Sequence, residues 1–275
     1  MLSSGAMERP HVVFLGTGGA LNPDRYQAAM LVQAAGTSFL LDVGGGLGVV
    51  RRLLACRVDP LSVRHVVLSH RHLDHVGGLE PLLMYMFYGA FRTGSPPPAV
   101  DVHALPGSSA AIRASLAAAD ASADKVFGER LTWRTPNPGT AVRVEGGATL
   151  TLVPVDHLPP GGEAAGCVVS AGGVRVVYSG DTRPCDALVE AARGADLLIH
   201  EVGGTDARAE LLHRVGHSTA ADAGRVAARA GVRALAMFHT PAAVWVSPED
   251  LLSEARRAAP GVEVFLSEDG MRWQL

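Results

Sequence analysis

The 275-residue sequence has little of what marks several large protein classes. Lys125 is the only lysine, aromatic residues make up 5% of the chain, and no apolar run reaches the ~18 residues of a transmembrane helix. Lys and Arg total 24 against 27 Asp and Glu, a formal net charge of −3. This balance excludes nucleic-acid binding through bulk positive charge. With 48% hydrophobic residues it also excludes low-complexity disorder.

Cysteine is equally scarce. Cys56, Cys167 and Cys185 lie far apart and form no Cys-x-x-Cys pair, so we expect no disulfide scaffold. The N-terminus has no basic segment followed by an apolar stretch, so we expect no signal peptide and a cytoplasmic location. Residues 1–10 are interpreted as a disordered leader or a cloning remnant, and residues 11–275 as a single domain.

Short apolar runs alternate with helical patterns along the chain. Each half begins with paired strands and ends with β–α alternation, which predicts an α/β fold of two sheets packed face to face with helices outside. Strands are predicted at 11–16, 29–33, 39–43, 64–69, 101–105, 130–134, 141–145, 148–155, 166–170, 174–179, 196–200 and 234–238, with two more closing the chain. Helices are predicted to open at 44–46 and to cover 78–88, 108–119, 184–193, 219–230 and 248–258.

The strongest motif follows the predicted strand 64–69. His70, His72, Asp74 and His75 fall within six residues there. Alternation on an extended segment points His70 and His72 the same way, whereas Asp74 and His75 follow where the chain turns into a helix and can face a second ion. Imidazoles combined with a carboxylate suit Zn²⁺, with Mn²⁺ or Fe²⁺ as alternatives. The motif therefore predicts a metal site rather than a surface histidine cluster.

Two metals need more ligands than this motif supplies. His157, Asp181 and His239 each stand just beyond the end of a predicted buried strand, where the sites of α/β proteins tend to lie. Taken singly, each has an ordinary structural alternative, such as a capping aspartate or a hydrogen-bonded core histidine. Taken with the histidine motif, they complete a ligand set for two ions.

These motifs resemble the metallo-β-lactamase superfamily along nearly the whole chain. The segment 14–19 is similar to the opening strand and turn of its ribonuclease Z-like branch, and 41–44 to its aspartate-bearing second motif. The resemblance implies a four-layer αββα sandwich of two mixed β-sheets, with the site at one edge between them. It also implies two zinc ions and a ligand assignment, with Asp42 fixing a ligand imidazole from behind. The assignment is His70, His72 and His157 on one zinc, Asp74, His75 and His239 on the other, and Asp181 bridging both.

The later motifs suggest a proton donor. Residues 179–202 are similar to ribonuclease Z and, more closely, to its arylsulfatase-like relatives, and 216–219 resembles the branch's later histidine motif. The resemblance pairs Glu201 with His217. A histidine oriented by a carboxylate is a competent proton donor near neutral pH. We therefore expect catalytic roles for His217, Glu201 and the metal-binding Asp74, which also orients the nucleophile. The alternatives are a backbone-bonded histidine at 217 and a surface acid at 201.

The sequence also departs from the family pattern. Ribonuclease Z carries a long tRNA-gripping arm between the positions that match His157 and Asp181, which here are 24 residues apart. The glutamate usual after the Asp42 motif is replaced by glycines at 44–46. These departures disfavour tRNA 3′-end processing and a nucleic-acid partner. Cys185 lies in no motif like the cysteine of true β-lactamases, so β-lactam hydrolysis is not expected.

The substrate pocket is harder to read. Tyr85, Phe87, Tyr88 and Phe91 follow the histidine motif, and Trp245 lies just beyond His239. They are candidates for an aromatic wall around a hydrophobic leaving group, and core packing is the alternative. Four further histidines are interpreted as structural or surface residues, namely His11, His65, His103 and His213.

We predict a dinuclear zinc-dependent hydrolase that cleaves a small phosphodiester or sulfate ester by attack of a metal-bridging hydroxide. The alternatives are a lactone or thioester hydrolase with the same site, a mononuclear iron oxygenase and a non-catalytic metal-binding protein. The expected partner is a small-molecule ester, without membrane association. Dimers are common among relatives of this branch, so the resemblance adds a homodimer as an option.

Overall fold

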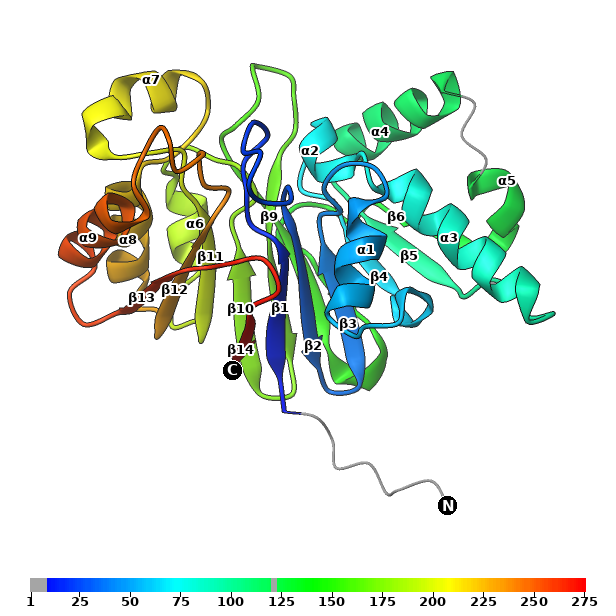
Figure 1. Cartoon of the computed structure of the whole chain (residues 1–275). Helices are drawn as coiled ribbons and strands as arrows, with labels where there is room; N and C mark the ends of the chain where they lie inside the picture. The colour runs from blue at the N-terminus through cyan, green and yellow to red at the C-terminus, as the bar shows by residue number, and fades with distance from the viewer. Residues whose placement is uncertain (1–8, 120–122) are drawn as a thin grey trace.

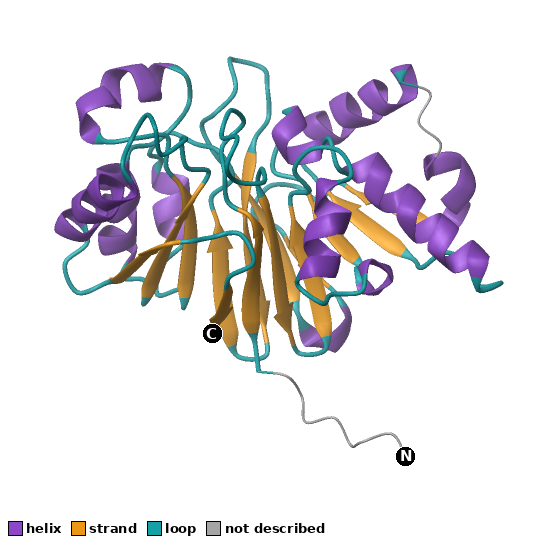
Figure 2. Cartoon of the chain, viewed as in Figure 1, coloured by secondary structure: helices purple, strands orange, loops and turns teal. Residues whose placement is uncertain are grey.

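Two seven-stranded sheets pack face to face in the computed structural model, with helices on both outer faces (Figure 1 and Figure 2). The structure describes residues 9–119 and 123–275. The leader expected at residues 1–10 lies outside these residues except for its last two positions. The α/β class and the αββα sandwich expected from the sequence are confirmed.

The first sheet has the strand order β14-β1-β2-β3-β4-β5-β6. Strands β14 to β3 pair antiparallel and β3 to β6 pair parallel, so the sheet is mixed. Its strands are β1 (His11–Gly16), β2 (Ala29–Ala34), β3 (Thr37–Leu41), β4 (His65–Val67), β5 (Val100–His103), β6 (Leu131–Arg134) and β14 (Arg272–Gln274).

The second sheet has the order β13-β12-β11-β10-β9-β8-β7. Strands β7 to β10 are antiparallel and β10 to β13 parallel, which repeats the mixed pattern of the first sheet. Its strands are β7 (Ala141–Arg143), β8 (Thr149–Pro154), β9 (Ala165–Ala171), β10 (Val174–Tyr178), β11 (Leu197–Glu201), β12 (Ala234–Phe238) and β13 (Glu263–Leu266).

Strand alternation builds three apolar layers. On β1, Val12 and Phe14 face the opposite sheet, whereas Val13 and Leu15 face the helices. The first sheet is covered by α1 (Gly48–Ala55), α3 (Leu79–Arg92), α4 (Pro106–Ala118) and α5 (Ala123–Phe127). The second is covered by α6 (Asp186–Ala191), α8 (Ala220–Ala230) and α9 (Pro248–Ala258). The remaining helices are α2 (Leu73–Val76), α7 (Ala209–Arg214) and the 3-10 turns η1 (Pro60–Ser62), η2 (Gly128–Arg130), η3 (Glu145–Gly147) and η4 (Asp206–Arg208).

The loops that follow β3, β4, β8, β10 and β12 gather at one edge between the sheets, near α2 at the top of Figure 1. The predicted strand 64–69 is shorter in the structure, because the chain leaves β4 after Val67 to enter this edge. Both described chain ends lie at the opposite edge. Within the described ranges, no helix has both the length and the apolar character needed to span a bilayer.

Candidate metal centre and active site

The first donor set consists of three imidazoles. His70 follows β4, His72 occupies the N-cap of α2, and His157 lies beyond the end of β8. Nδ1 of His72 lies 2.9 Å from Nε2 of His70 and 3.2 Å from Nε2 of His157. Three ring nitrogens from two sheets therefore converge on one point.

The second donor set combines carboxylate and imidazole. Asp74 and His75 both come from the single-turn helix α2, and His239 follows β12. Oδ2 of Asp74 lies 3.4 Å from Nε2 of His75 and 3.4 Å from Nε2 of His239. The short helix thus turns two adjacent side chains away from the first set and toward the second.

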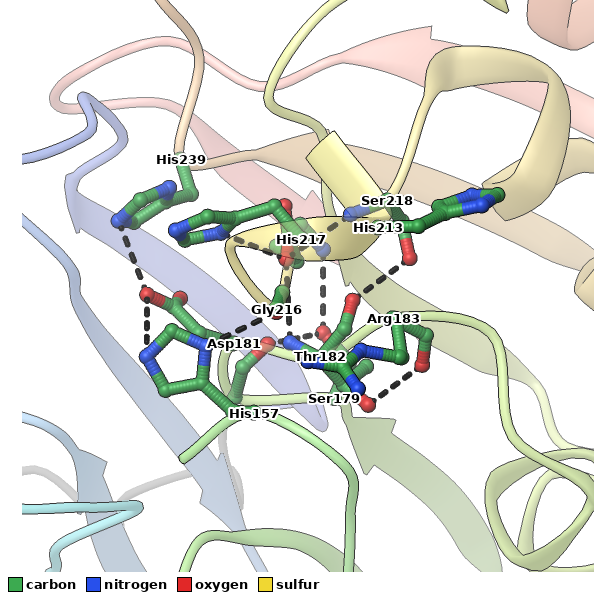
Figure 3. A network of polar contacts seen from close by, with 12 residues as sticks. His157, Ser179, Asp181, Thr182, Arg183, His213, Gly216, His217, Ser218 and His239 are labelled. Atoms are coloured by element: carbon green, nitrogen blue, oxygen red, sulfur yellow. Dashed lines mark hydrogen bonds and ion pairs between the residues drawn. The ribbon is translucent and has the colours of Figure 1, made fainter. Parts of the chain in front are cut away.

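Asp181 lies between the two sets. Its Oδ2 is 3.2 Å from Nε2 of His75 and 3.3 Å from Nε2 of His239. The same oxygen is 3.9 Å from Nε2 of His70 and 4.0 Å from Nε2 of His157. Figure 3 shows His157 and His239 approaching this carboxylate from opposite sides. One oxygen therefore faces all four imidazoles, which is the position of a bridging ligand.

The donor sets fit divalent metal ions. A tetrahedral ion with bonds of ~2.1 Å places its ligands about 3.4 Å apart, close to the donor separations within each set. Nε2 of His75 and Oδ1 of Asp181 are buried and make no hydrogen bond. Buried polar atoms normally find a hydrogen-bond partner. Two such atoms that lack a partner, beside the converging lone pairs of the other donors, indicate a place for a cation.

Electrostatics favours the ligand states that a cation needs at the three imidazoles of the first set and at Asp181. Burial lowers the pKa of His70, His72 and His157, so these imidazoles are neutral near pH 7. Burial opposes ionisation of Asp181, but the imidazoles facing it lower its pKa well below the usual range. Neutral imidazoles and an ionised carboxylate are the protonation states that bind metal.

Asp42 orients one of these ligands. Its fully buried Oδ2 accepts hydrogen bonds from Nδ1 of His75 at 2.7 Å, from the Ser69 hydroxyl at 2.6 Å and from the Tyr178 hydroxyl at 2.7 Å. Because Nδ1 of His75 donates to Asp42, its Nε2 is directed at the donor set. Burial lowers the pKa of His75, but the carboxylates of Asp181 and Asp42 outweigh this effect and raise the pKa well above its ordinary value. A metal ion held by Nε2 would therefore have to displace a proton.

Two turns with unusual backbone geometry help to place the ligands. Asp42 and His239, each directly after a strand end, adopt left-handed backbone with φ of 54° and 58°. Such conformations are uncommon for non-glycine residues and concentrate at functional sites. Nδ1 of His157 bonds the Gly216 carbonyl at 2.9 Å. A Cβ at Gly216 would lie 2.3 Å from the His157 carbonyl oxygen, so this contact requires glycine.

His217 and Glu201 form a hydrogen-bonded pair beside the second donor set. Nδ1 of His217 lies 2.9 Å from Oε1 of Glu201, which also accepts the backbone N–H of Thr182 at 3.0 Å and of Ser218 at 3.2 Å. The His217 ring stacks on His239, with 5.4 Å between centroids (Figure 3). Burial lowers the pKa of His217, but Glu201 raises it more, to about 9. His217 therefore carries a proton at neutral pH.

The aromatic candidates divide between two regions. Trp245 lines a pocket together with His217 and His239. Tyr85, Phe87, Tyr88 and Phe91 lie on α3, where Phe87 packs against the outer layer of the first sheet and the other three are exposed. None of these four lines the pocket, because α3 runs away from the site along the outer face of that sheet (Figure 1). Their positions do not support the aromatic wall expected from the sequence.

Sequence reasoning missed two groups that support the site. The Ser69 backbone N–H bonds Oδ1 of Asp42 at 2.8 Å, and the Tyr178 hydroxyl reaches the other oxygen from β10. Both residues adjoin segments singled out from the sequence, and the alternation of β10 directs Tyr178 between the sheets. That alternation is the sequence signal that points to Tyr178.

Comparisons with known proteins agree with this architecture. A profile described as the beta-lactamase superfamily domain matches residues 37–240. Ribonuclease Z of Mycobacterium avium is 33% identical over 280 residues, covering 96% of this chain and 98% of that protein. Ribonuclease Z of Mycobacterium bovis is 31% identical over 262 residues, covering 87% and 89%. The metallo-beta-lactamase fold protein YhfI from Bacillus subtilis superimposes with a TM-score of 0.81 at 22% identity, covering 98% of this chain and all of that one.

An αββα sandwich with histidine and aspartate donors converging at one edge defines a class of metal-dependent hydrolases. The chain belongs to the metallo-β-lactamase superfamily, and ribonuclease Z proteins are among its relatives.

Proposed function

We propose that the protein is a dinuclear zinc-dependent hydrolase of a small phosphodiester or sulfate ester. The observation that carries this proposal is the position of Asp181 Oδ2, within 4.0 Å of Nε2 atoms from both donor sets. Nitrogen-rich donors with two carboxylates favour Zn²⁺ over Mg²⁺ or Ca²⁺. Two divalent ions bound there supply an activated water and neutralise charge on the substrate's oxygens.

The chain's own residues divide the remaining work. His70, His72 and His157 would hold one ion and the second donor set the other, with Asp181 placed between the two sets. His217 donates its proton to the oxygen of the leaving alcohol or phenol, because its raised pKa keeps it protonated at neutral pH. Glu201 fixes the tautomer and orientation of His217. Asp74 would bind metal and orient the attacking water.

A second candidate, RNA endonuclease activity, is favoured by the ribonuclease Z relatives along most of the chain. Against it, only residues 155–164 connect β8 and β9, which leaves no space for the tRNA-gripping arm that the family resemblance leads us to expect. The near-neutral charge balance also provides no bulk attraction for RNA. We therefore propose a small anionic ester as substrate, and a cytoplasmic enzyme.

The test compares substrates on one zinc-loaded preparation. Hydrolysis of bis(p-nitrophenyl) phosphate, p-nitrophenyl sulfate, a p-nitrophenyl acyl ester and a precursor tRNA is measured in parallel, with metal-free protein as the control. We expect zinc-dependent turnover of the phosphodiester or the sulfate. Cleavage of the tRNA alone supports the endonuclease, and turnover of the acyl ester alone supports a lactone or thioester hydrolase. No turnover despite two bound ions supports a non-catalytic role.

A further inference from the structure

A small apolar pocket opens beside the proposed proton donor. Its volume is about 170 Å³, and its lining includes His217 and His239. The apolar side chains of the lining come from three separate segments, namely Leu21, Leu212, Pro241 and Trp245. No Lys, Arg, Asp or Glu occurs among the described residues that line it.

Hydrogen bonds hold the walls of this pocket in place. Nδ2 of Asn22 donates to the carbonyls of Thr240 at 3.0 Å and Pro241 at 3.2 Å, tying the loop after β1 to the loop after β12. The backbone N–H of Gly19 donates to Thr240 at 3.0 Å, which adds a second tie between the same loops. A pocket with a fixed shape selects by size, because it does not remodel around each ligand.

Glycine keeps the inner end of the pocket open toward the metal centre. A Cβ at Gly19 would lie 3.2 Å from Nδ1 of His239 and crowd the ring of that ligand. On the other wall, the His217 backbone N–H bonds the Leu212 carbonyl at 2.8 Å. The pocket is therefore continuous with both a metal ligand and the proton donor.

We propose that this pocket binds the leaving-group half of the substrate and selects an uncharged alcohol about the size of one aromatic ring, such as a phenol. The inference rests on the proposed function, in which His217 protonates the departing oxygen. Water's oxygen bonds to phosphorus or sulfur as the ester bond to the leaving group breaks, and one proton of that water is released to solvent, from which His217 later regains a proton. The electron pair of that bond stays on the leaving oxygen, which takes the His217 proton. The group carrying that oxygen must therefore lie on the His217 side.

Size and polarity both support this choice. An apolar cavity of roughly 150 Å³ accommodates benzene, which is close to the volume found here. A carboxylate or phosphate on the leaving group would lose hydration and meet no counter-ion except His217, whose charge is already paired with Glu201. At the rim, the side chains of Leu21 and Trp245 are 76% and 59% exposed, apolar surface that a bound ring would cover. The substrate class is therefore an aryl or similarly compact apolar ester.

Binding of the isolated leaving group tests the pocket without any turnover. Calorimetric titration of the full-length, metal-free protein compares p-cresol with 4-hydroxybenzoate, which differ in a methyl group against a carboxylate. We expect p-cresol to bind at least about tenfold tighter. Trp245→Ala should weaken p-cresol binding about fivefold or more. The neighbouring Val244→Ala, at an 84% exposed residue that does not line the pocket, should leave it within twofold.

A sharper test adds a positive charge to the pocket in order to remove its preference for the uncharged phenol. Leu21→Arg supplies the missing counter-ion, so it should bring 4-hydroxybenzoate to at least parity with p-cresol. The preference for an uncharged over a carboxylated leaving group is then measured in the zinc-loaded enzyme. It is the ratio of kcat/KM for methyl phenyl phosphate to kcat/KM for methyl 4-carboxyphenyl phosphate. Equal binding of the two phenols, or equal effects of Trp245→Ala and Val244→Ala, overturns the inference. A binding preference without hydrolysis of any ester supports the pocket and overturns the proposed function. Hydrolysis of the esters without a binding preference supports the proposed function and overturns the inference about the pocket.

Discussion

Two groups of clustered histidines in this molecule use their nitrogens differently. In the candidate metal centre, five imidazoles direct one nitrogen each toward Asp181 or toward one another's lone pairs. In the second group, Nε2 of His65 lies 3.0 Å from both carboxylate oxygens of Glu145, and its Nδ1 lies 3.2 Å from Nε2 of His103. Asp101, close to the same two rings, is paired with Arg134 at 3.2 Å.

The difference lies in where the hydrogen bonds are made. At the metal centre they hold the outer nitrogens, as Asp42 holds His75 and Gly216 holds His157, so the inner nitrogens point to a common centre. In the His65–His103 group the bonds run in a line from carboxylate to ring to ring, so both nitrogens of His65 and Nε2 of His103 already have partners. Proximity of histidines therefore does not make a metal site, whereas orientation from outside does. Each prediction below tests this distinction.

The largest effect is expected from removing the shared ligand. Asp181→Ala should lose metal and reduce hydrolysis at least ~1000-fold, because both ions lose a contact. Asp101→Ala, which removes the carboxylate of the other group, should leave both unchanged. Metal content by mass spectrometry and the rate of phosphodiester hydrolysis measure the pair. Wild-type metal and activity in Asp181→Ala would sink the bridging assignment, and loss of an ion in Asp101→Ala would make the second group a metal site.

The proton donor comes next. His217→Ala should retain the metal but slow turnover by roughly 100-fold to 1000-fold for esters with poor leaving groups, and far less for nitrophenyl esters. The reason is that a stable leaving anion needs no proton. A plot of rate against the acidity of the leaving group, for wild type and variant, provides the measurement. Equal slowing across the series contradicts a proton-donor role.

A moderate effect is expected from the residue that orients a ligand. Asp42→Asn should lower metal affinity about 10-fold to 100-fold, because the amide no longer holds Nδ1 of His75 as a charged acceptor. Competition with a chelator measures the affinity. Glu145→Gln makes the equivalent change behind His65 and should leave metal affinity unaltered. If the two variants behave alike, orientation from outside is not what separates the two groups.

Much of this arrangement was readable from the sequence, and the exceptions have physical causes. Strand periodicity predicted both sheets, and His157, Asp181 and His239 stood out because each follows a buried strand. The α3 aromatics do not line the pocket beside His217, and helical spacing alone does not show how far a helix runs from a site. The pocket beside His217 was not predictable, because it joins Leu21, Leu212 and Pro241 across loops that only the packed sandwich brings together. Of its apolar lining, only Trp245 was anticipated.

The smallest effect concerns stability in the group without a metal. Burial, with the neighbouring charge of His65, lowers the pKa of His103 from 6.5 to about 4. The unfolded chain therefore takes up a proton at His103 before the folded protein does, so its contribution to stability is complete above pH 6.5 and is lost as the pH falls toward 4. Over the first pH unit below 6.5 this residue should reduce the free energy of unfolding by about 1 kcal/mol. Urea unfolding of metal-free wild type and His103→Leu should show a shallower pH dependence in the variant, with unchanged hydrolysis once zinc is added. Parallel pH profiles would mean that His103 is not held neutral by the fold, and the contrast between the two histidine groups would then rest on geometry alone.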